Sequence, residues 1–458
     1  MANELLEKLK EYSKGGYLAM HMPGHKRKSG FLPYFPAEID ITEIDGFDNL
    51  HDMTGVLLAL SKKLASLYRV NTALPLVGGS TCGILAAVTA AAKKNAALIM
   101  ARNCHKAVYN AARINRLIPK YIYPEEGENG VAGEISVKSV KEALKNTPSA
   151  CALVLTSPTF EGKVSEIKKI SALCREHGVK LIVDSAHGAH FSLHEAFPEN
   201  AVSLGADYAV ISLHKTLPAP TSCAAVLTDN IDDRLLSYCV SLYETSSPSY
   251  VFLAAIESCT ELLSGKKEQL FSSLICNLTE FYNKTTKLKA LKVFYFDDPS
   301  RIIVSTRGAN ITSAALADIL RKEYRIEPEM CYTDYIVMIS TVCDSKEDFL
   351  RLSCALKEAD ALLLPKKKPA YPPLCKPKQI LPPFEADFKN AELLPLSACE
   401  GRISSEYAFA YPPGCPLICP GELIDKEVLN LFSSYKALDV EIKGCISKKE
   451  GFLYCLKN

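Results

Sequence analysis

The sequence of 458 residues contains no tryptophan and no long hydrophobic run. A helix that crosses a bilayer needs about 20 predominantly apolar residues in succession, and no stretch here approaches that length. The N-terminal segment MANELLEKLKEYSKGG is polar and rich in lysine and glutamate, unlike a secretory signal peptide. We therefore expect a cytoplasmic protein that has no membrane partner.

An excess of charge of either sign is also missing. Lysine and arginine together number 53 and aspartate and glutamate 52, which gives a formal net charge of +1. Proteins that bind nucleic acid carry a basic patch that contacts phosphates, and none is evident here. The run Lys366-Lys367-Lys368 lies in a proline-rich stretch, where we interpret it as solvated. We expect no nucleic-acid partner.

The 17 cysteines include no CxxC pair, and the closest two are Cys415 and Cys419. No second pair or nearby histidine completes a metal-ligand set, so we expect no metal site. Cysteines in a large cytosolic chain usually behave as small buried apolar residues. Histidine is missing from the second half of the chain, because all nine lie between His21 and His214. This distribution places the chemistry in the first half.

What the first half contains is a pair of segments, VDSAHGAHF and DYAVISLHKT, within residues 183–216. Asp184 ends one apolar run, and Lys215 follows another 31 residues later. Two strands of one sheet can bring this acid and this amine to the same edge. Pyridoxal phosphate (PLP) requires such a pair: a lysine that bonds its aldehyde and an acid that keeps its pyridine nitrogen protonated. The pattern, with His187 and His214 alongside, predicts a PLP site.

Apolar strands and helices alternate along residues 56–228, which predicts an α/β fold with a parallel sheet covered on both faces. Ligand sites of such sheets lie at the carboxyl ends of the strands. The turn GGSTCG (78–83), followed by an expected helix over 84–93, is suited to binding phosphate. His105, Ser157, Asp184 and Lys215 are also expected at those ends.

The remainder of the chain predicts further units. A long helix is expected over 251–263, a smaller α+β domain follows, and seven prolines in 365–383 indicate an extended linker. The expected divisions are 1–50 (an N-terminal arm and loops that cover the site), 51–270 (large PLP-binding domain), 271–365 (small α+β domain), 366–383 (linker) and 384–458 (C-terminal domain).

Eight motifs together give a resemblance to one known family. The sequence resembles the PLP-dependent ornithine/lysine/arginine decarboxylases of the aspartate-aminotransferase fold, in their short bacterial form, over nearly the whole chain. The motifs are HMPGHK (21–26), GGSTCG (78–83), RNCHKAV (102–108), SPTFEG (157–162), DSAHGAHF (184–191), SLHKTLPA (212–219), TSSPSY (245–250) and YPPGCPLICPGE (411–422).

The resemblance implies a role for each matching residue. Lys215 would bond the cofactor, Asp184 would pair with its ring nitrogen, and His105 would stack on the ring and act in catalysis. Ala186 would pack on the other ring face, and His187 would lie near the phenolic oxygen. Further cofactor contacts are expected at Ser80, Thr81, Cys82, Ser157, Ser212 and His214, and at Ser246 toward the neighbouring subunit of a homodimer whose site lies at the interface.

The substrate is expected to be arginine, lysine or ornithine, giving agmatine, cadaverine or putrescine and CO2 in polyamine biosynthesis. A basic side chain needs carboxylates in the distal pocket. The candidates are Glu161, Glu244, Asp45 and Asp48, with His25 from the N-terminal loop. Relatives commonly have Asn-Gly where this chain has Gly78-Gly79, and some have Tyr-Tyr-Gly where it has Phe160-Glu161-Gly162. The second difference bears on the identity of the substrate.

Two other classes of function stay open on the sequence. The same fold and cofactor serve aminotransferases, lyases and aldolases, which the released product would distinguish. A non-catalytic PLP-binding protein is the second alternative.

Overall fold

The protein was analysed as a computed structural model that describes residues 4–16, 19–20, 22–23, 25–31, 34–125, 127, 131–231, 233–366, 375–410, 416–437 and 442–457. Parts of two predicted motifs therefore lie outside the described residues: His21 and Gly24 of HMPGHK, and YPPGC (411–415) with its Cys415. Much of the predicted linker, 367–374, also lies outside them.

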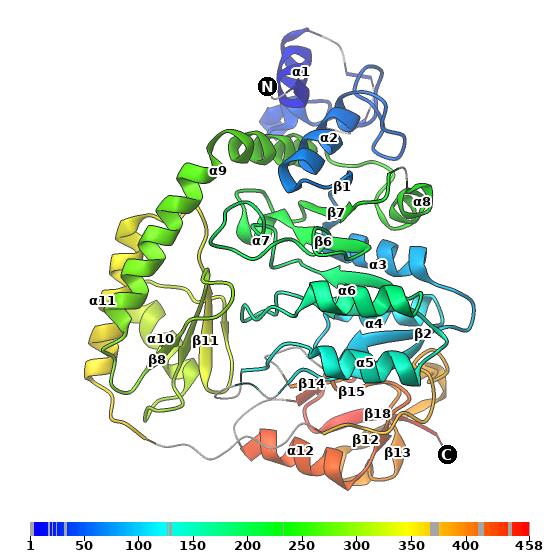
Figure 1. The fold of residues 1–458 in the computed structure, drawn as a ribbon, viewed down its shortest axis with the longest axis vertical. Coiled ribbons are helices and arrows are strands. Elements are labelled where there is room, and N and C mark those ends of the chain that lie inside the picture. The colour runs from blue at the N-terminus through cyan, green and yellow to red at the C-terminus, as the bar shows by residue number, and fades with distance from the viewer. Residues whose placement is uncertain are drawn as a thin grey trace.

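The centre of the molecule is a seven-stranded sheet in the order β1-β7-β6-β5-β4-β2-β3 (Figure 1). The pairs β6–β5, β5–β4, β4–β2 and β2–β3 are parallel, whereas β7 runs antiparallel to both of its neighbours. The predicted, mainly parallel α/β sheet is confirmed. The strands are β1 Thr72–Leu76, β2 Ala97–Ala101, β3 Ile118–Ile122, β4 Ala150–Thr156, β5 Lys180–Asp184, β6 Tyr208–Ser212 and β7 Ala224–Thr228.

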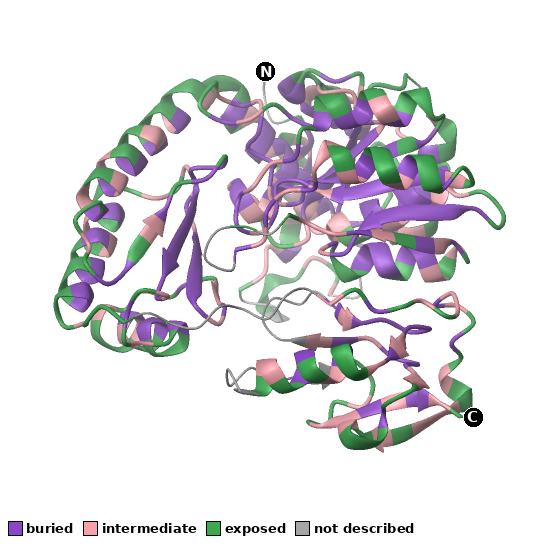
Figure 2. Cartoon of the chain, turned by 60° about the horizontal axis from the view of Figure 1, so that its bottom comes forward, coloured by how far each residue is buried: buried purple, intermediate pink, exposed green. Residues whose placement is uncertain are grey.

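Helices between these strands pack on the sheet, and Figure 2 shows buried strands with exposed outer helix faces. The prediction for α3 was wrong at its start, because the helix begins at Gly79 instead of Ile84. The glycine-hydroxyl turn is therefore the first turn of the helix itself. The helices of this part are α2 Val56–Tyr68, α3 Gly79–Ala91, α4 Lys106–Ile114, α5 Val137–Asn146, α6 Ile167–Glu176, α7 Leu213–Thr216 and α8 Arg234–Tyr243.

A single helix, α9 (Tyr250–Thr285), leads from the large sheet to a second, four-stranded antiparallel sheet in the order β10-β11-β9-β8. The prediction of a helix ending at Leu263 was too short. The segment 292–307 forms two strands of this sheet. The elements here are β8 Lys292–Phe294, β9 Arg301–Ser305, α10 Ser313–Tyr324, β10 Met330–Cys331, β11 Tyr335–Ile339 and α11 Lys346–Ala361.

The C-terminal part consists of short antiparallel strands and one helix beneath the large sheet in Figure 1. It has a separate small hydrophobic core around Ile418, Val428 and Phe432. Its elements are β12 Ala391–Pro395, β13 Arg402–Ile403, β14 Ala408–Ala410, β15 Pro416–Ile418, β16 Leu423–Ile424, α12 Lys426–Ala437, β17 Ile442–Gly444 and β18 Phe452–Leu456, with the 3-10 turns Phe388–Asn390 and Leu396–Ala398.

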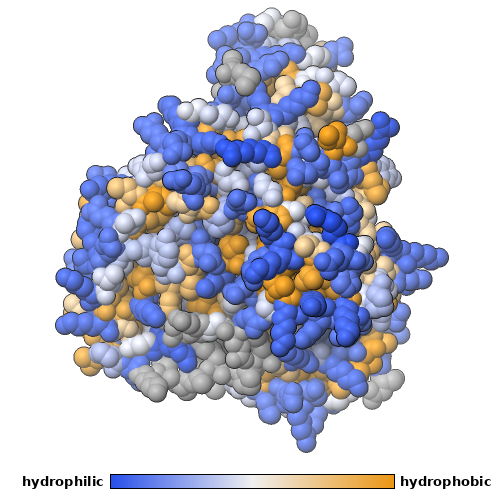
Figure 3. Space-filling view, viewed as in Figure 1, coloured by the Kyte–Doolittle hydropathy of each residue, from blue (hydrophilic) through white to orange (hydrophobic). Residues whose placement is uncertain are grey.

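The N-terminal arm contains α1 (Glu4–Lys14) and the 3-10 turns Ser29–Phe31 and Ala37–Ile39. The backbone N–H groups of Leu5 and Leu6 donate to the Glu257 carboxylate of α9, which holds the arm against that helix. None of the described helices combines the length and hydrophobicity that a bilayer crossing requires. Figure 3 shows a largely hydrophilic face with separate small hydrophobic patches.

The domain divisions remain a proposal. Residue 270 lies inside α9, so we propose that the large and small domains meet along this helix rather than at a loop.

Candidate active site

Asp184 and Lys215 lie at the same edge of the large sheet. Asp184 is the last residue of β5, and β6, its parallel neighbour, leads directly into the short helix α7 that carries Lys215. Asp184 is buried, and its Oδ1 accepts a hydrogen bond from the Ala186 N–H at 3.1 Å. This bond fixes the carboxylate and places the buried Ala186 directly beside it.

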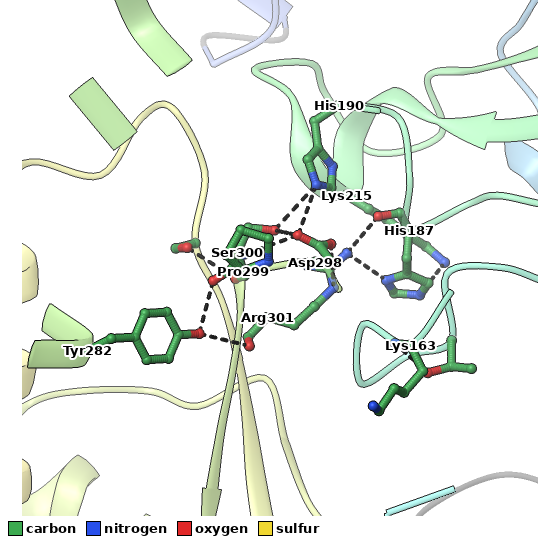
Figure 4. A network of polar contacts seen from close by, with 11 residues as sticks. Lys163, His187, His190, Lys215, Tyr282, Asp298, Pro299, Ser300 and Arg301 are labelled. Atoms are coloured by element: carbon green, nitrogen blue, oxygen red, sulfur yellow. Dashed lines mark hydrogen bonds and ion pairs between the residues drawn. The ribbon is translucent and has the colours of Figure 1, made fainter. Parts of the chain in front are cut away.

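The Lys215 amine is in contact with His187, as Figure 4 shows. Lys215 Nζ lies 3.0 Å from His187 Nε2, and the Arg301 guanidinium lies 3.2 Å from His187 Nδ1. Burial lowers the pKa of Lys215, the nearby Arg301 lowers it further, and Asp184 opposes the shift. Burial together with the positive charges of Lys215 and Arg301 holds the pKa of His187 well below its usual value. The imidazole of His187 is therefore neutral at physiological pH.

His105 is the N-cap of α4, where its Nδ1 accepts a hydrogen bond from the Ala107 N–H at 3.3 Å. The residue reaches solvent, although protein atoms crowd its imidazole and lower its pKa by burial. The Asp184 carboxylate opposes this shift, and Lys215 adds to it. His105 thus lies within electrostatic range of both groups.

In the part of the chain that the structure describes, no side-chain hydrogen bond caps the N-terminus of α3. Gly79 has a φ of +76°, a left-handed conformation that favours glycine, and Gly78 provides no side-chain cap for the helix. Of the two residues that follow, Ser80 is half-buried and Thr81 is exposed. The Cys82 side chain is buried instead, and burial and the Glu244 carboxylate raise its pKa.

Three buried side-chain oxygens at this edge lack a hydrogen-bond partner among the described residues. They belong to Asn103 after β2, Thr156 at the end of β4, and Ser212 at the end of β6. Buried polar groups are nearly always satisfied, so these oxygens are suited to a polar ligand. With the uncapped N-terminus of α3, the acid and the amine, they fit PLP: N–H groups for the phosphate, a carboxylate for the ring nitrogen and an amine for the aldehyde.

Two other predicted contacts are already engaged by the protein. Ser157 Oγ accepts from the Ser165 N–H at 3.2 Å and braces the loop that follows β4. His214 Nδ1 donates to the Cys223 carbonyl at 3.0 Å, which fixes the orientation of its ring.

The predicted substrate carboxylates lie in different surroundings. Glu161 is buried and accepts from the Tyr335 hydroxyl at 2.9 Å, and burial raises its pKa. Glu244 accepts from the backbone N–H groups of Val77 and Gly78 at 3.0 and 2.9 Å, so it braces the turn before α3. The Asp48 carboxylate likewise accepts from backbone N–H groups, among them those of Gly55 and Leu57.

Three further predicted residues lie at the surface or in the arm. His25 Nε2 is 3.1 Å from Asp40 Oδ2 within the N-terminal arm. Asp45 is exposed. Ser246 is exposed in the loop after α8, two residues from the Glu244 that binds the turn before α3.

Sequence reasoning missed Arg301, whose side chain is fully buried beside His187. The one local signal is an arginine at the head of an apolar strand, RIIVS. It also missed Arg102, three residues before His105, which binds Glu422 of the C-terminal part through contacts of 2.6 and 2.9 Å. This pairing connects the end of β2 with the C-terminal part.

Comparison with known proteins agrees with this fold and site. The family described as Orn/Lys/Arg decarboxylase, major domain, matches residues 4–313, and its C-terminal domain matches 374–454. Arginine decarboxylase of Bacillus subtilis (strain 168) is 28% identical over 465 residues, 94% of this chain and 92% of that protein. Arginine decarboxylase of Halalkalibacterium halodurans is 27% identical over 461 residues, covering 94% and 93%. The structure of Escherichia coli constitutive lysine decarboxylase superposes with a TM-score of 0.84 at 17% identity, covering 100% of this chain and 82% of that one.

The fold and the strand-end lysine and aspartate define a PLP-dependent enzyme of the aspartate-aminotransferase fold. Both family models match in chain order, and the first covers more than half of the sequence. The chain belongs to the Orn/Lys/Arg decarboxylase family, and it is a PLP-dependent decarboxylase of basic amino acids.

Proposed function

We propose that the protein converts arginine to agmatine and CO2, in the cytoplasm and in the service of polyamine biosynthesis. The observation that carries the proposal is the meeting of Asp184 and Lys215 at one edge of the sheet, at the ends of parallel neighbouring strands. The choice of arginine over lysine or ornithine is supported by the relatives named arginine decarboxylases that match over nearly the whole chain.

We assign the cofactor-binding roles as follows. Lys215 bonds the cofactor aldehyde, and Asp184 keeps a proton on the ring nitrogen. Ala186 and His105 pack against the two ring faces, and His187 lies by the phenolic oxygen. The phosphate is held by Ser80 and Thr81, the N–H groups at the start of α3 including that of Cys82, Ser212 and His214, with Ser157 supporting the loop.

Bound PLP supplies the electron sink that accepts the bonding electrons as CO2 leaves. The chain's own residues then control orientation and proton transfer. A substrate held with its carboxylate bond perpendicular to the ring loses CO2 without competing bond cleavage. His105 and Lys215 are the residues that would return a proton to Cα. Burial lowers the pKa of Lys215, which brings this amine toward the range in which general acids and bases work near neutral pH. Burial also lowers the pKa of His105, which favours its neutral imidazole.

The substrate side chain remains to be placed. The candidates for contact with the basic end of the substrate are Glu161, Glu244, Asp45, Asp48 and His25. We favour Glu161, because burial raises its pKa and a substrate cation beside it would stabilise the charged carboxylate. Glu244 and Asp48 already satisfy backbone N–H groups in this structure.

The test is direct. Purified protein with added PLP is given arginine, lysine or ornithine separately, and CO2 and amine are measured. Agmatine as the main product supports the proposal, whereas cadaverine or putrescine would reassign the substrate, and pyruvate or an aldehyde would point to a different PLP reaction.

The variant Lys215→Ala should lose both turnover and the visible absorbance of lysine-bound cofactor. Lys168→Ala, on the exposed face of α6, is the matched control and should retain both. A fully active Lys215→Ala protein would contradict the assignment of this lysine.

We also propose a homodimer whose site includes Ser246 of the neighbouring subunit. Supporting it, α8 exposes Leu235, Tyr238 and Leu242 along one helical face, at 57, 60 and 53% of their surface. The Ser246 loop follows this helix directly. Tyr238→Glu should shift the protein toward monomer in sedimentation velocity, while Ser237→Glu on the exposed neighbouring position should not. An unchanged dimer would place the interface elsewhere.

A further inference from the structure

We propose that Arg301 is a positioning residue that fixes the proton of His187 on Nε2 and so keeps the Lys215 amine unprotonated and ready for an aldehyde. The proposal rests on the proposed role of Lys215. It assigns a function to a small-domain residue that no sequence motif marks, and it links the two domains through three side chains.

The hydrogen-bond chain begins at Arg301, whose guanidinium can only donate. Its Nη2 donates to the His187 carbonyl oxygen at 2.9 Å and to His187 Nδ1 at 3.2 Å. An imidazole nitrogen that accepts a hydrogen bond carries a lone pair, so the single proton of neutral His187 lies on Nε2.

That proton points to the lysine. His187 Nε2 is 3.0 Å from Lys215 Nζ. An N–H can donate only to an atom with a lone pair, and among the forms of a lysine amine only the unprotonated one has it. The chain is therefore complete in one arrangement: Arg301 donates to His187, and His187 donates to a neutral Lys215.

The opposite arrangement of protons, with Lys215 protonated, leaves two donors facing each other at Arg301. A protonated Lys215 would donate to His187 Nε2, which would move the imidazole proton to Nδ1. That proton would then face an N–H of Arg301 at a separation of 3.2 Å between the nitrogens, with two donors and no acceptor. Because the guanidinium stays charged at any physiological pH, it decides between the two arrangements.

On balance, burial and the charges around Lys215 and His187 also favour the neutral forms of both groups. Burial lowers the pKa of Lys215, Asp184 and Glu329 oppose the shift, and Arg301 supports it, with a net lowering. For His187 the burial effect is reinforced by every charged neighbour: Lys215, Arg301, His105 and His214. Lys215 does not gain enough from the two carboxylates to recover its usual pKa.

Arg301 is held rigidly enough to direct His187. Its side chain is fully buried, with Nε 3.8 Å from Asp298 Oδ2. A Cβ at Gly162, which has a φ of +96°, would lie 2.9 Å from both Cβ and Cγ of Arg301, so only glycine lets the arginine stem pass. The Asp298 N–H donates to the Gly162 carbonyl at 3.0 Å, which ties the segment before β9 to the loop of the large domain.

The consequence concerns the chemistry of loading. A lysine attacks an aldehyde through its unprotonated form, and an ordinary lysine with a pKa of about 10.4 offers little of that form near pH 7. The Arg301–His187 pair raises that share at the amine the cofactor must meet. After Lys215 has bonded the cofactor, the same pair leaves the His187 Nε2–H aimed at this edge of the sheet.

The experiment uses the full-length apoprotein and follows PLP association by visible absorbance as a function of pH. In Arg301→Met the midpoint for the Lys215 amine should rise by about one pH unit, so the association rate near pH 7 should fall roughly tenfold. Arg307→Met is the control and should leave the rate unchanged, because Arg307 lies two residues beyond the end of β9 and its guanidinium pairs with Asp334. The ionisations of free PLP are common to all three proteins and cancel in the rate ratios.

A second measurement does not depend on the folding of the Arg301 variant. Nitrogen-15 NMR of histidine-labelled wild-type apoprotein, with His187→Asn to assign the signal, should show His187 neutral and protonated on Nε2. A proton on Nδ1, or equal pH midpoints for wild type and a folded Arg301→Met, would overturn the proposal. Failure of the proposed function is a separate result, because it would appear as PLP bound covalently by Lys215→Ala.

Discussion

At the scale of single residues, the buried Asp298 carboxylate shows how strongly neighbouring groups can shift a pKa. Its Oδ1 is 3.1 Å from His190 Nε2 and accepts from the Ser300 hydroxyl at 2.6 Å and the Ser300 N–H at 3.0 Å. Burial by itself would raise the pKa of Asp298, but His190, Arg301 and Ser300 outweigh it and lower the pKa to about 2. The charged form is therefore the stabilised one.

This shift predicts a pH-dependent stability. The pKa of Asp298 is lower in the folded chain than its usual 3.8, so its contribution is fully present above pH 3.8 and is lost as the pH falls through about 2. A shift of this size corresponds to roughly 2–3 kcal/mol. Asp298→Asn should lower the melting temperature at pH 6, and the difference from wild type should shrink below pH 4.

The neighbouring residue provides the control. Asp297 is exposed, so Asp297→Asn should change the melting temperature little at any pH. A difference for Asp298→Asn that stays constant from pH 6 to pH 3 would show that the carboxylate charge is not what stabilises the domain contact.

The sequence can predict the position of a site residue when that residue directly follows or ends a recognisable strand. Asp184 and Lys215 both end apolar runs, and parallel neighbours place such ends together, as β5 and β6 do. Arg301 could not be found in this way, because its contact with His187 depends on how the small domain packs against the large one. The catalytic and binding roles of these residues stay predictions.

At the scale of elements, the sequence predicts a helix well where one face is apolar throughout. Helical periodicity from Val56 to Tyr68 predicts a helix over these residues, and α2 has the same bounds. For α9 the expected helix ends at Leu263, just before the polar stretch SGKKEQ, yet the helix continues to Thr285. The reason is packing: Phe271, Leu274, Leu278 and Phe281 recur at helical spacing and are buried, which carries the helix across its polar turn.

Two glycines in helices predict opposite outcomes for the same substitution. A Cβ at Gly83 of α3 would lie 2.7 Å from Val210 Cγ1 and 2.9 Å from Leu76 Cδ1, so Gly83→Ala should destabilise the fold by about 1–3 kcal/mol. Nothing lies within 4 Å of a Cβ at Gly265 of α9, so Gly265→Ala should stabilise by about 0.5–1 kcal/mol. Thermal unfolding of the two apoproteins measures both signs, and a neutral Gly83→Ala would mean that α3 can lift off the sheet at no cost.

At the scale of the whole molecule, the C-terminal part docks beside the candidate site through one buried ion pair. Arg102, at the end of β2, pairs with both oxygens of Glu422, and its Nε donates to the Pro416 carbonyl at 3.2 Å. The Tyr109 hydroxyl donates to the Arg102 carbonyl at 2.6 Å, which joins the start of α4 to the same contact. The tail is thus fastened three residues from His105, so its loosening should reach the site.

Breaking this pair on one side should cost more than removing it entirely. Glu422→Met leaves the Arg102 guanidinium buried without its carboxylate, and such a loss costs about 3–5 kcal/mol. The double variant Arg102→Met/Glu422→Met leaves no stranded charge and should recover most of that loss, because Met fills similar space on both sides. Urea unfolding of wild type, both single variants and the double variant completes the cycle, and amide hydrogen exchange in β15, β16 and α4 locates the change. If the double variant is as unstable as the sum of the singles, the docking contact does not act as a coupled pair. The C-terminal part would then be held mainly by apolar packing around Cys419, which belongs to the main hydrophobic core.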